Sequence, residues 1–120
     1  MDDPVLAVLF DTAESVAVSL VLAIDGMLIS GTTASYAQFL AGVEDRMAWE
    51  GTQFTVRISQ GLKDLRQSAD LSVPPDTFYV RDATIWSAGQ TWLAPWWAGR
   101  RSAISGWWFG EAKPPVQIGK

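Results

Sequence analysis

The chain has 120 residues, a length that predicts one domain, residues 1–120, with its own hydrophobic core. It contains no cysteine and no histidine, which excludes a disulfide framework, a thiolate metal site and histidine-based acid–base catalysis. The net charge is −4, with five acids and no base in residues 1–25, whereas residues 81–120 carry five bases and two acids.

Residues 1–14 are predicted to form an N-terminal helix, because Asp3 can cap it and Pro4 suits its first position. The face expected to pack on a sheet consists of Val5, Val8, Leu9 and Thr12. The acidic start does not resemble a signal peptide, and no apolar run reaches the ~20 residues of a spanning helix. We therefore expect a cytoplasmic protein without a membrane span.

A β-hairpin is predicted next. Residues 16–24 alternate between larger apolar and smaller side chains, as in a strand with one buried face. Asp25-Gly26 is a typical two-residue hairpin turn, and residues 27–33 form the returning strand. Gly31 within that strand indicates a bulge or a close approach of another backbone.

Two helical patterns follow the hairpin. Ser35 and Gln38 can form a capping box for a helix that reaches about Trp49 and ends at Gly51. Apolar residues in 52–69 recur at helical spacing, which favours a second helix, although 55–58 also fit a strand. The helical insertion therefore separates the second and third strands.

Three further strands are predicted after Pro74-Pro75. They comprise residues 78–86, 96–105 and 107–109, with a loop at 89–95 that carries Trp92 and a loosely held tail at 110–120. The fold class is α+β: a small, strongly curved antiparallel sheet of about five strands, an Sm/SH3-like partial barrel. Its bends are expected at Gly31, Gly99 and Gly106.

Six of the seven tryptophans lie between residues 86 and 108. Strand neighbours point to opposite faces, so the pairs Trp96-Trp97 and Trp107-Trp108 cannot both face one core. Part of each pair must meet a second layer, a partner or solvent. Because Trp and Arg are enriched at binding hot spots, the predicted contact segment consists of Trp96, Trp97, Arg100, Trp107, Trp108 and Phe109.

The sequence offers no constellation for catalysis, a metal or a cofactor. Its carboxylates fall in turns, beside bases or on a helix surface, and no dense acidic loop is present. Residues 30–33 are not followed by the Gly-Lys pair of a phosphate-binding loop. Aromatic and basic residues could stack single-stranded nucleic acid, but an acidic chain with few bases argues against it.

Two blocks in order resemble the gas-vesicle accessory protein U family. The first is VSLVLAIDGMLISGTTASYAQFL and the second is FYVRDATIW followed by WWAGRRSAISGWWFG. More faintly, the blocks resemble the two halves of an Sm-like barrel, a family that forms rings and binds RNA. That comparison implies the curved barrel; RNA binding is the alternative function.

The first resemblance implies a small cytoplasmic, non-catalytic protein that associates with gas-vesicle shell proteins and promotes clustering by self-association. An uncapped strand edge supports a homo-oligomer, since such an edge can pair with another chain. The matching positions in the hairpin are Gly26, Ile29, Ser30, Gly31 and Thr32. Those near the end are Trp97, Gly99, Arg100, Gly106 and Gly110. We expect Gly26, Gly31, Gly99, Gly106 and Gly110 to shape turns and bends.

Overall fold

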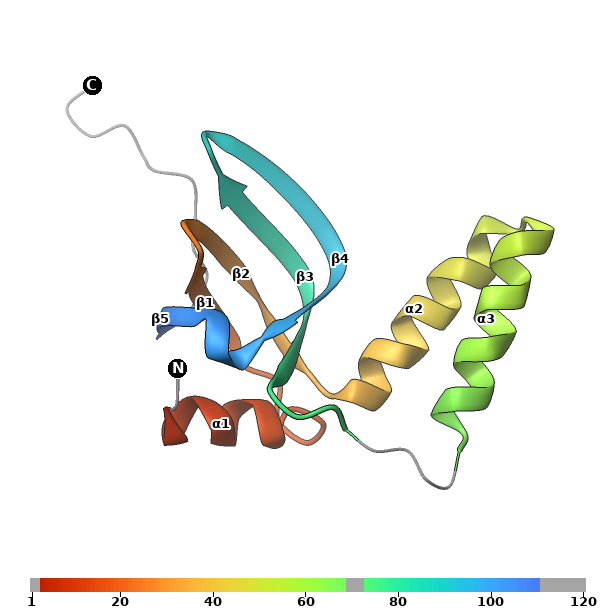
Figure 1. Ribbon diagram of the computed structural model, residues 1–120, viewed down its shortest axis with the longest axis horizontal. Coiled ribbons are helices and arrows are strands. Elements are labelled where there is room, and N and C mark those ends of the chain that lie inside the picture. The colour runs from red at the N-terminus through yellow and green to blue at the C-terminus, as the bar shows by residue number, and fades with distance from the viewer. Residues whose placement is uncertain (1–2, 69–72, 111–120) are drawn as a thin grey trace.

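The computed structural model describes residues 3–68 and 73–110. This part comprises an antiparallel sheet, a short helix beneath it and a two-helix arm that projects away (Figure 1). The strands are β1 (Ser19–Ile24), β2 (Met27–Ala34), β3 (Thr77–Ser87), β4 (Gln90–Arg100) and β5 (Ile104–Phe109). The helices are α1 (Pro4–Asp11), α2 (Tyr36–Glu50) and α3 (Gln53–Arg66), with a 3-10 turn, η1 (Arg101–Ala103). The predicted α+β class is confirmed.

The strands lie in the order β4-β3-β2-β1-β5, and every neighbouring pair is antiparallel. Among the described residues no pairing joins β4 to β5, so the sheet is open and each of these strands has a free edge. The predicted strongly curved partial barrel is therefore not confirmed. Of the predicted tail at 110–120, only Gly110 lies within the described residues.

Helix α1 begins as predicted but presents a different face. The Asp3 carboxylate accepts hydrogen bonds from the backbone N–H groups of Val5 and Leu6, and Pro4 occupies the first turn. Leu6 and Phe10 are buried and Leu9 packs against the core, whereas Val5 and Val8 are exposed, so the predicted packing face is wrong except at Leu9. Contacts made by Asp3 and Asp11 at either end of the helix fix its rotation, and their partners come from β5 and η1.

The hairpin of β1 and β2 is confirmed. Its turn residues Asp25 and Gly26 have φ values of 48° and 79°, as a two-residue hairpin turn requires. The register of β2 against β3 shifts between Ser30 and Thr32, where Gly31 lies opposite two residues of β3, Asp82 and Ala83. The predicted bulge is therefore present opposite Gly31, but its extra residue is in β3. A Cβ atom at Gly31 would lie 3.1 Å from the Val80 Cβ, so the predicted close approach is also confirmed.

The two helices of the insertion form an arm. The predicted capping box of Ser35 and Gln38 is present, and Gly51 ends α2 with a φ of 73°. Thr52 caps the next helix by accepting a hydrogen bond from the Thr55 N–H. The α3 segment is therefore a helix, as favoured, and the strand alternative for residues 55–58 is wrong.

The β3–β4 hairpin corrects two predictions. Ala88 and Gly89, with φ values of 51° and 75°, make a two-residue turn, so residues 90–95 are strand and the predicted loop is wrong. The sequence pattern does not predict a turn at Ala88-Gly89, because alanine seldom adopts a positive φ. Pro95 is tolerated since β4 is an edge strand. The predicted strand at 96–105 is also wrong, because η1 interrupts it and β5 begins at Ile104.

The core lies on the face of the sheet that α1 covers, the inner face. Apolar side chains from all the strands except β4 and from α1 are buried there, and Trp97 and Ala94 of β4 pack against them. The buried members are Leu6, Phe10, Leu20, Leu22, Ile24, Ile29, Phe78, Val80, Ala83, Ile85 and Ile104. Within the described part of the chain, no helix has the length and apolar character needed to cross a membrane.

Candidate interaction surface

The adjacent residues Trp96 and Trp97 point to opposite faces of β4, as predicted. Trp97 lies on the inner face, with its ring centroid 5.7 Å from that of Phe78. Trp96 lies on the opposite side of the sheet against α2, where its ring meets the Phe39 ring edge-on at a centroid distance of 6.2 Å. Both rings are half-buried within the chain itself. The second layer that receives Trp96 is the arm.

The second pair, Trp107 and Trp108, divides differently. The Trp107 indole N–H donates a hydrogen bond to the Asp3 carboxylate at 2.9 Å, and its ring packs against the core. Trp108 points outward and is 73% exposed. Phe109 follows at the end of β5, meets Trp107 edge-on at 5.0 Å, and remains about half exposed. Trp108 and Phe109 are therefore the aromatic side chains of the predicted segment that are open to solvent.

Trp108 belongs to a row of outward side chains that crosses the whole sheet. The register pairs Trp108 with Val21, Val21 with Ser30, and so on through Thr84 to Leu93 on β4. The neighbouring row consists of Gly106, Ala23, Leu28, Trp86 and Thr91. Neither row contains a charged residue, and Leu93 is 80% exposed. We call these two rows the outer face.

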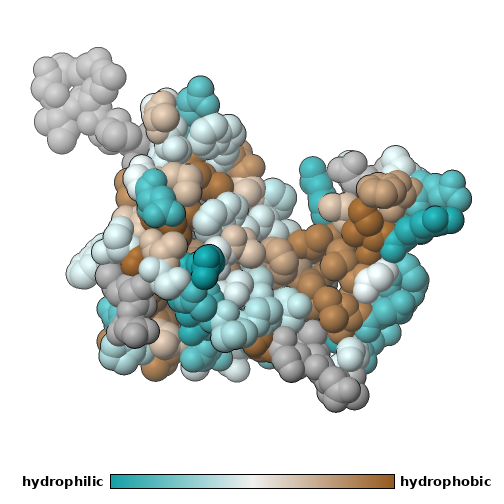
Figure 2. All heavy atoms as spheres, viewed as in Figure 1, coloured by the Kyte–Doolittle hydropathy of each residue, from teal (hydrophilic) through white to brown (hydrophobic). Residues whose placement is uncertain are grey.

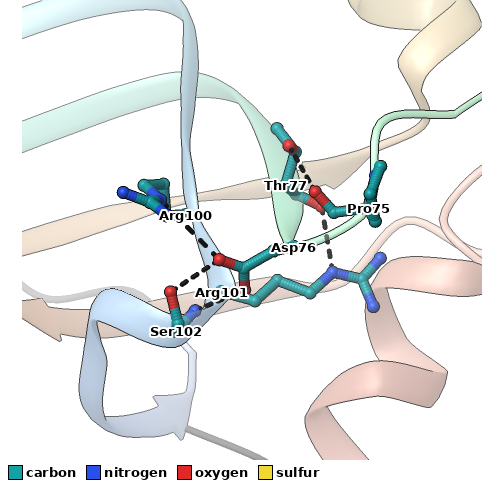
Figure 3. A network of polar contacts seen from close by, with 6 residues as sticks. All are labelled: Pro75, Asp76, Thr77, Arg100, Arg101 and Ser102. Carbon is teal, nitrogen blue, oxygen red and sulfur yellow. Dashed lines mark hydrogen bonds and ion pairs between the residues drawn. The ribbon is translucent and has the colours of Figure 1, made fainter.

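Polar contacts fix the turn between β4 and β5. The Asp76 carboxylate accepts hydrogen bonds from the Ser102 backbone N–H at 2.8 Å and hydroxyl at 2.6 Å, and Arg100 approaches it at 3.7 Å (Figure 3). Arg101 donates to the Thr77 carbonyl and forms a 2.8 Å ion pair with Asp11. Because the Arg100 side chain is largely exposed, its ion pair is screened and leaves it available to a partner.

Two carboxylates of this region are held in their ionised form. The hydrogen bond from Trp107 lowers the pKa of Asp3 below its ordinary value of 3.8, with smaller contributions from the backbone N–H groups of Leu6 and Val5. The hydroxyl of Ser102 is the main cause that lowers the pKa of Asp76, aided by the Ser102 N–H and Arg100. Both groups therefore act as anionic anchors for structure, and neither is a candidate general acid.

The five glycines of the predicted turns and bends lie at distinct places. Gly26 occupies the β1–β2 turn, and Gly110 follows β5 with a φ of 101°. Gly31 lies in β2 opposite the bulge of β3, and Gly106 lies in β5 opposite Ala23. Gly99 is sterically constrained, since a Cβ atom there would lie 2.7 Å from the Phe78 ring.

A groove of about 550 Å³ lies between α1 and the start of β3. Its lining includes Leu6, Phe10, Asp3, Asp76, Arg101 and Ser102. Each of the four polar side chains already makes one of the contacts given above, so the polar groups of the groove stabilise the fold. In residues 3–68 and 73–110 no three acidic side chains come together as a metal site would need.

The structure also exposes apolar residues that the sequence interpretation did not single out. Leu93 lies in the segment that was predicted to be a loop. Trp49 and Phe54, 83% and 73% exposed, flank the turn at the tip of the arm. Figure 2 shows apolar residues along the side of the arm that faces the sheet and hydrophilic residues along its outer side. For Phe54, the spacing of apolar residues in α3 is the sequence signal that could have revealed the exposed position.

Comparison with known proteins identifies a family. The family model described as gas vesicle protein GvpU-like matches residues 3–112, nearly the whole chain. No curated protein and no solved structure matches the chain.

Proposed function

Because this chain belongs to the gas vesicle protein GvpU-like family, we propose that it is a non-enzymatic accessory protein of gas vesicles in the cytoplasm. It contacts the proteins of the vesicle shell and promotes clustering by self-association. The observation that carries this proposal is the outer face, which has no charged residue and ends in the exposed Trp108 beside a free strand edge. Exposed apolar surface of this kind favours contact with another protein.

The contact segment consists of the residues predicted from the sequence, which take two roles. Trp108, Phe109 and Arg100 reach the partner directly, since they are exposed. Trp96, Trp97 and Trp107 hold the backbone of β4 and β5 in position, since their rings pack against α2 and the core. Aromatic and Arg side chains at the centre of an interface contribute most of its binding energy.

Self-association through a strand edge is part of the same proposal. β4 and β5 each lack a partner on one side among the described residues, and their free N–H and C=O groups can pair with a second copy. The purified protein should therefore sediment above the monomer mass at micromolar concentration. A monomer mass that persists over a hundredfold dilution would contradict this part of the proposal.

The partial barrel remains a proposal about the fold. β4 and β5 lie at opposite edges, about 19 Å apart in a flat sheet, yet only η1 separates Arg100 from Ile104. Four residue steps span at most about 14 Å. This short connection supports a sheet that curls at the end where η1 lies. β4–β5 hydrogen bonds confined to that end in a crystal structure would establish a partial barrel and leave the rest of each edge free to pair with a second copy.

A pull-down with purified gas vesicles tests the proposed function. Wild-type protein should sediment with the vesicles, whereas Trp108→Ser should remain in the supernatant. Val8→Ser is the matched control, because Val8 is an exposed apolar residue of α1, which lies on the other side of the sheet from the outer face. Equal vesicle binding by the wild type and the Trp108→Ser protein would show that this surface does not contact the shell.

RNA binding by an Sm-like oligomer is the alternative, and salt dependence distinguishes it. Contacts with phosphate weaken steeply as the salt concentration rises, and they require basic side chains (Lys or Arg). The two rows of the outer face contain no basic residue, and the exposed Arg81 lies on the next row of the same side, paired with Trp96. The absence of basic residues from these two rows favours a protein partner. In filter binding at low salt we expect no retention of single-stranded RNA; retention that falls steeply with salt would establish the alternative.

A further inference from the structure

Helix α3 carries an apolar seam that its own chain leaves open. No residue of α3 is buried, and the helix packs mainly on α2. Phe54, Ile58, Gly61 and Leu65 are spaced by 4, 3 and 4 residues, the repeat that places side chains along one line between two helices. Phe54 and Leu65 are exposed, and a Cβ atom at Gly61 would meet nothing within 4 Å. Ile58 is half-buried, so the seam is open at Phe54, Gly61 and Leu65 and partly open at Ile58.

The sizes of the seam residues match a second copy of the same helix. If two α3 helices pack antiparallel about a two-fold axis, Phe54 of one copy lies opposite Leu65 of the other. Ile58 then lies opposite Gly61, so the branched side chain of each copy enters the space beside the glycine of the other. The seam is complementary to itself in this orientation.

The charges beside the seam favour the same orientation. Arg57 and Asp64 occupy equivalent positions seven residues apart, on the flank that faces away from α2. In an antiparallel pair these flanks meet, which brings Arg57 of each copy within about 3 Å, along the helix axis, of Asp64 of the other. Two opposite-charge pairs result. In a parallel pair Arg57 would lie beside Thr55 or Leu62 and would gain no charge partner.

The arm also meets a second copy without net repulsion. Residues 36–68 contain four acids and four bases, so the net charge of −4 resides elsewhere. From these observations we propose that two copies of this chain associate through α3, antiparallel, with Ile58 packed on Gly61 and Arg57 paired with Asp64 across the contact.

This contact is distinct from the strand edges, so it provides each copy with a second means of self-association. A particle that clusters vesicles needs more than one contact, because a single contact joins only two bodies. The seam of α3 from Phe54 to Leu65 is about 17 Å long and buries less than the ~800 Å² per partner of a standard interface. We therefore expect weak, concentration-dependent association. The role of this contact in clustering rests on the proposed function, but the contact itself can be measured without vesicles.

Charge reversal in the full-length chain tests the contact. Sedimentation from about 10 µM to 1 mM should show the wild-type mass rising with concentration. Arg57→Asp alone, or Asp64→Arg alone, places like charges together twice and should shift this rise about tenfold higher in concentration. The double variant R57D/D64R restores opposite charges and should restore association. This rescue separates a lost contact from a lost fold, and circular dichroism checks helix content.

An apolar pair of variants completes the test. Phe54→Ser should weaken association, whereas Val8→Ser, at an exposed apolar residue of α1, should not. The inference is overturned if Arg57→Asp and Phe54→Ser leave association unchanged, if R57D/D64R does not restore it, or if the wild type stays monomeric at 1 mM. Loss with Trp108→Ser alone would assign self-association to β5. No vesicles are present, so either result leaves the vesicle pull-down to be judged separately.

Discussion

The indole ring of Trp96 on β4 lies directly against Gly42 of α2. A Cβ atom built at Gly42 would overlap the six-membered ring, so only glycine lets the helix approach the sheet this closely. Phe39, one turn earlier, meets the same ring edge-on. This contact, together with the stacking of Tyr36 on Tyr79, joins the arm to the sheet. The direction in which α3 projects therefore depends on it.

Two glycine substitutions within helices should have opposite effects. Gly42→Ala should destabilise the protein by about 1–3 kcal/mol, because the added methyl displaces Trp96. Gly61→Ala should stabilise it by about 0.5–1 kcal/mol, since alanine favours a helix and this site is open. Urea unfolding at low protein concentration measures both. In a Trp96→Leu background, Gly42→Ala should lower the free energy of unfolding by less than it does in the wild type. If the effects of the two substitutions on that free energy were additive, they would contradict the proposed overlap.

Substitution of the two adjacent tryptophans of β5 should affect the stability of the protein differently. Trp107→Ala should cost about 3 kcal/mol, because the ring packs against the core and its N–H is bonded to Asp3. Trp108→Ala should change the free energy of unfolding by less than about 0.5 kcal/mol, since that side chain is largely exposed. Thermal unfolding followed by circular dichroism checks both. Equal losses would show that β5 does not have the described facing.

Gly99 should tolerate no side chain. Gly99→Ala places a methyl group 2.5 Å from the Trp97 ring and 2.7 Å from the Phe78 ring, both of which are packed against the core. Neither ring can withdraw without opening the core, so we expect a loss of about 1–3 kcal/mol. Ala98→Ser, at the preceding residue of the same strand, is the control, because Ala98 is exposed. A loss below about 0.5 kcal/mol for Gly99→Ala would contradict this packing.

The Asp76 network should make stability fall in acid. Its folded pKa lies below the ordinary value of 3.8, so its stabilising contribution is complete above pH 3.8 and is lost as the pH falls through the folded pKa. Asp76→Asn should therefore be less stable than the wild type at neutral pH, with a difference that shrinks below pH 3.8. Urea midpoints over this range measure it. A difference that is constant with pH would contradict an ionic role for Asp76.

The sequence by itself determined most local structure. Asp3 and Pro4, Ser35 and Gln38, and Asp25-Gly26 specify helix starts and a hairpin turn through contacts within a few residues, so composition and spacing suffice to predict them. Alternation of side chains also determined that neighbouring tryptophans must diverge. The Ala88-Gly89 turn was missed because it depends on strand pairing that overrides the preference of alanine for negative φ.

The tertiary structure decided which rings are covered. Trp96 and Trp108 both point away from the core, yet α2 covers Trp96 whereas nothing among the described residues covers Trp108 to the same extent. The uncharged rows of the outer face likewise arise only when residues distant in sequence are paired in register. The spacing of the α3 seam lies in the sequence, but its exposure is decided by which described elements pack on that helix. Burial depends on which elements meet, and a one-dimensional pattern records the face a side chain takes but not what lies opposite that face.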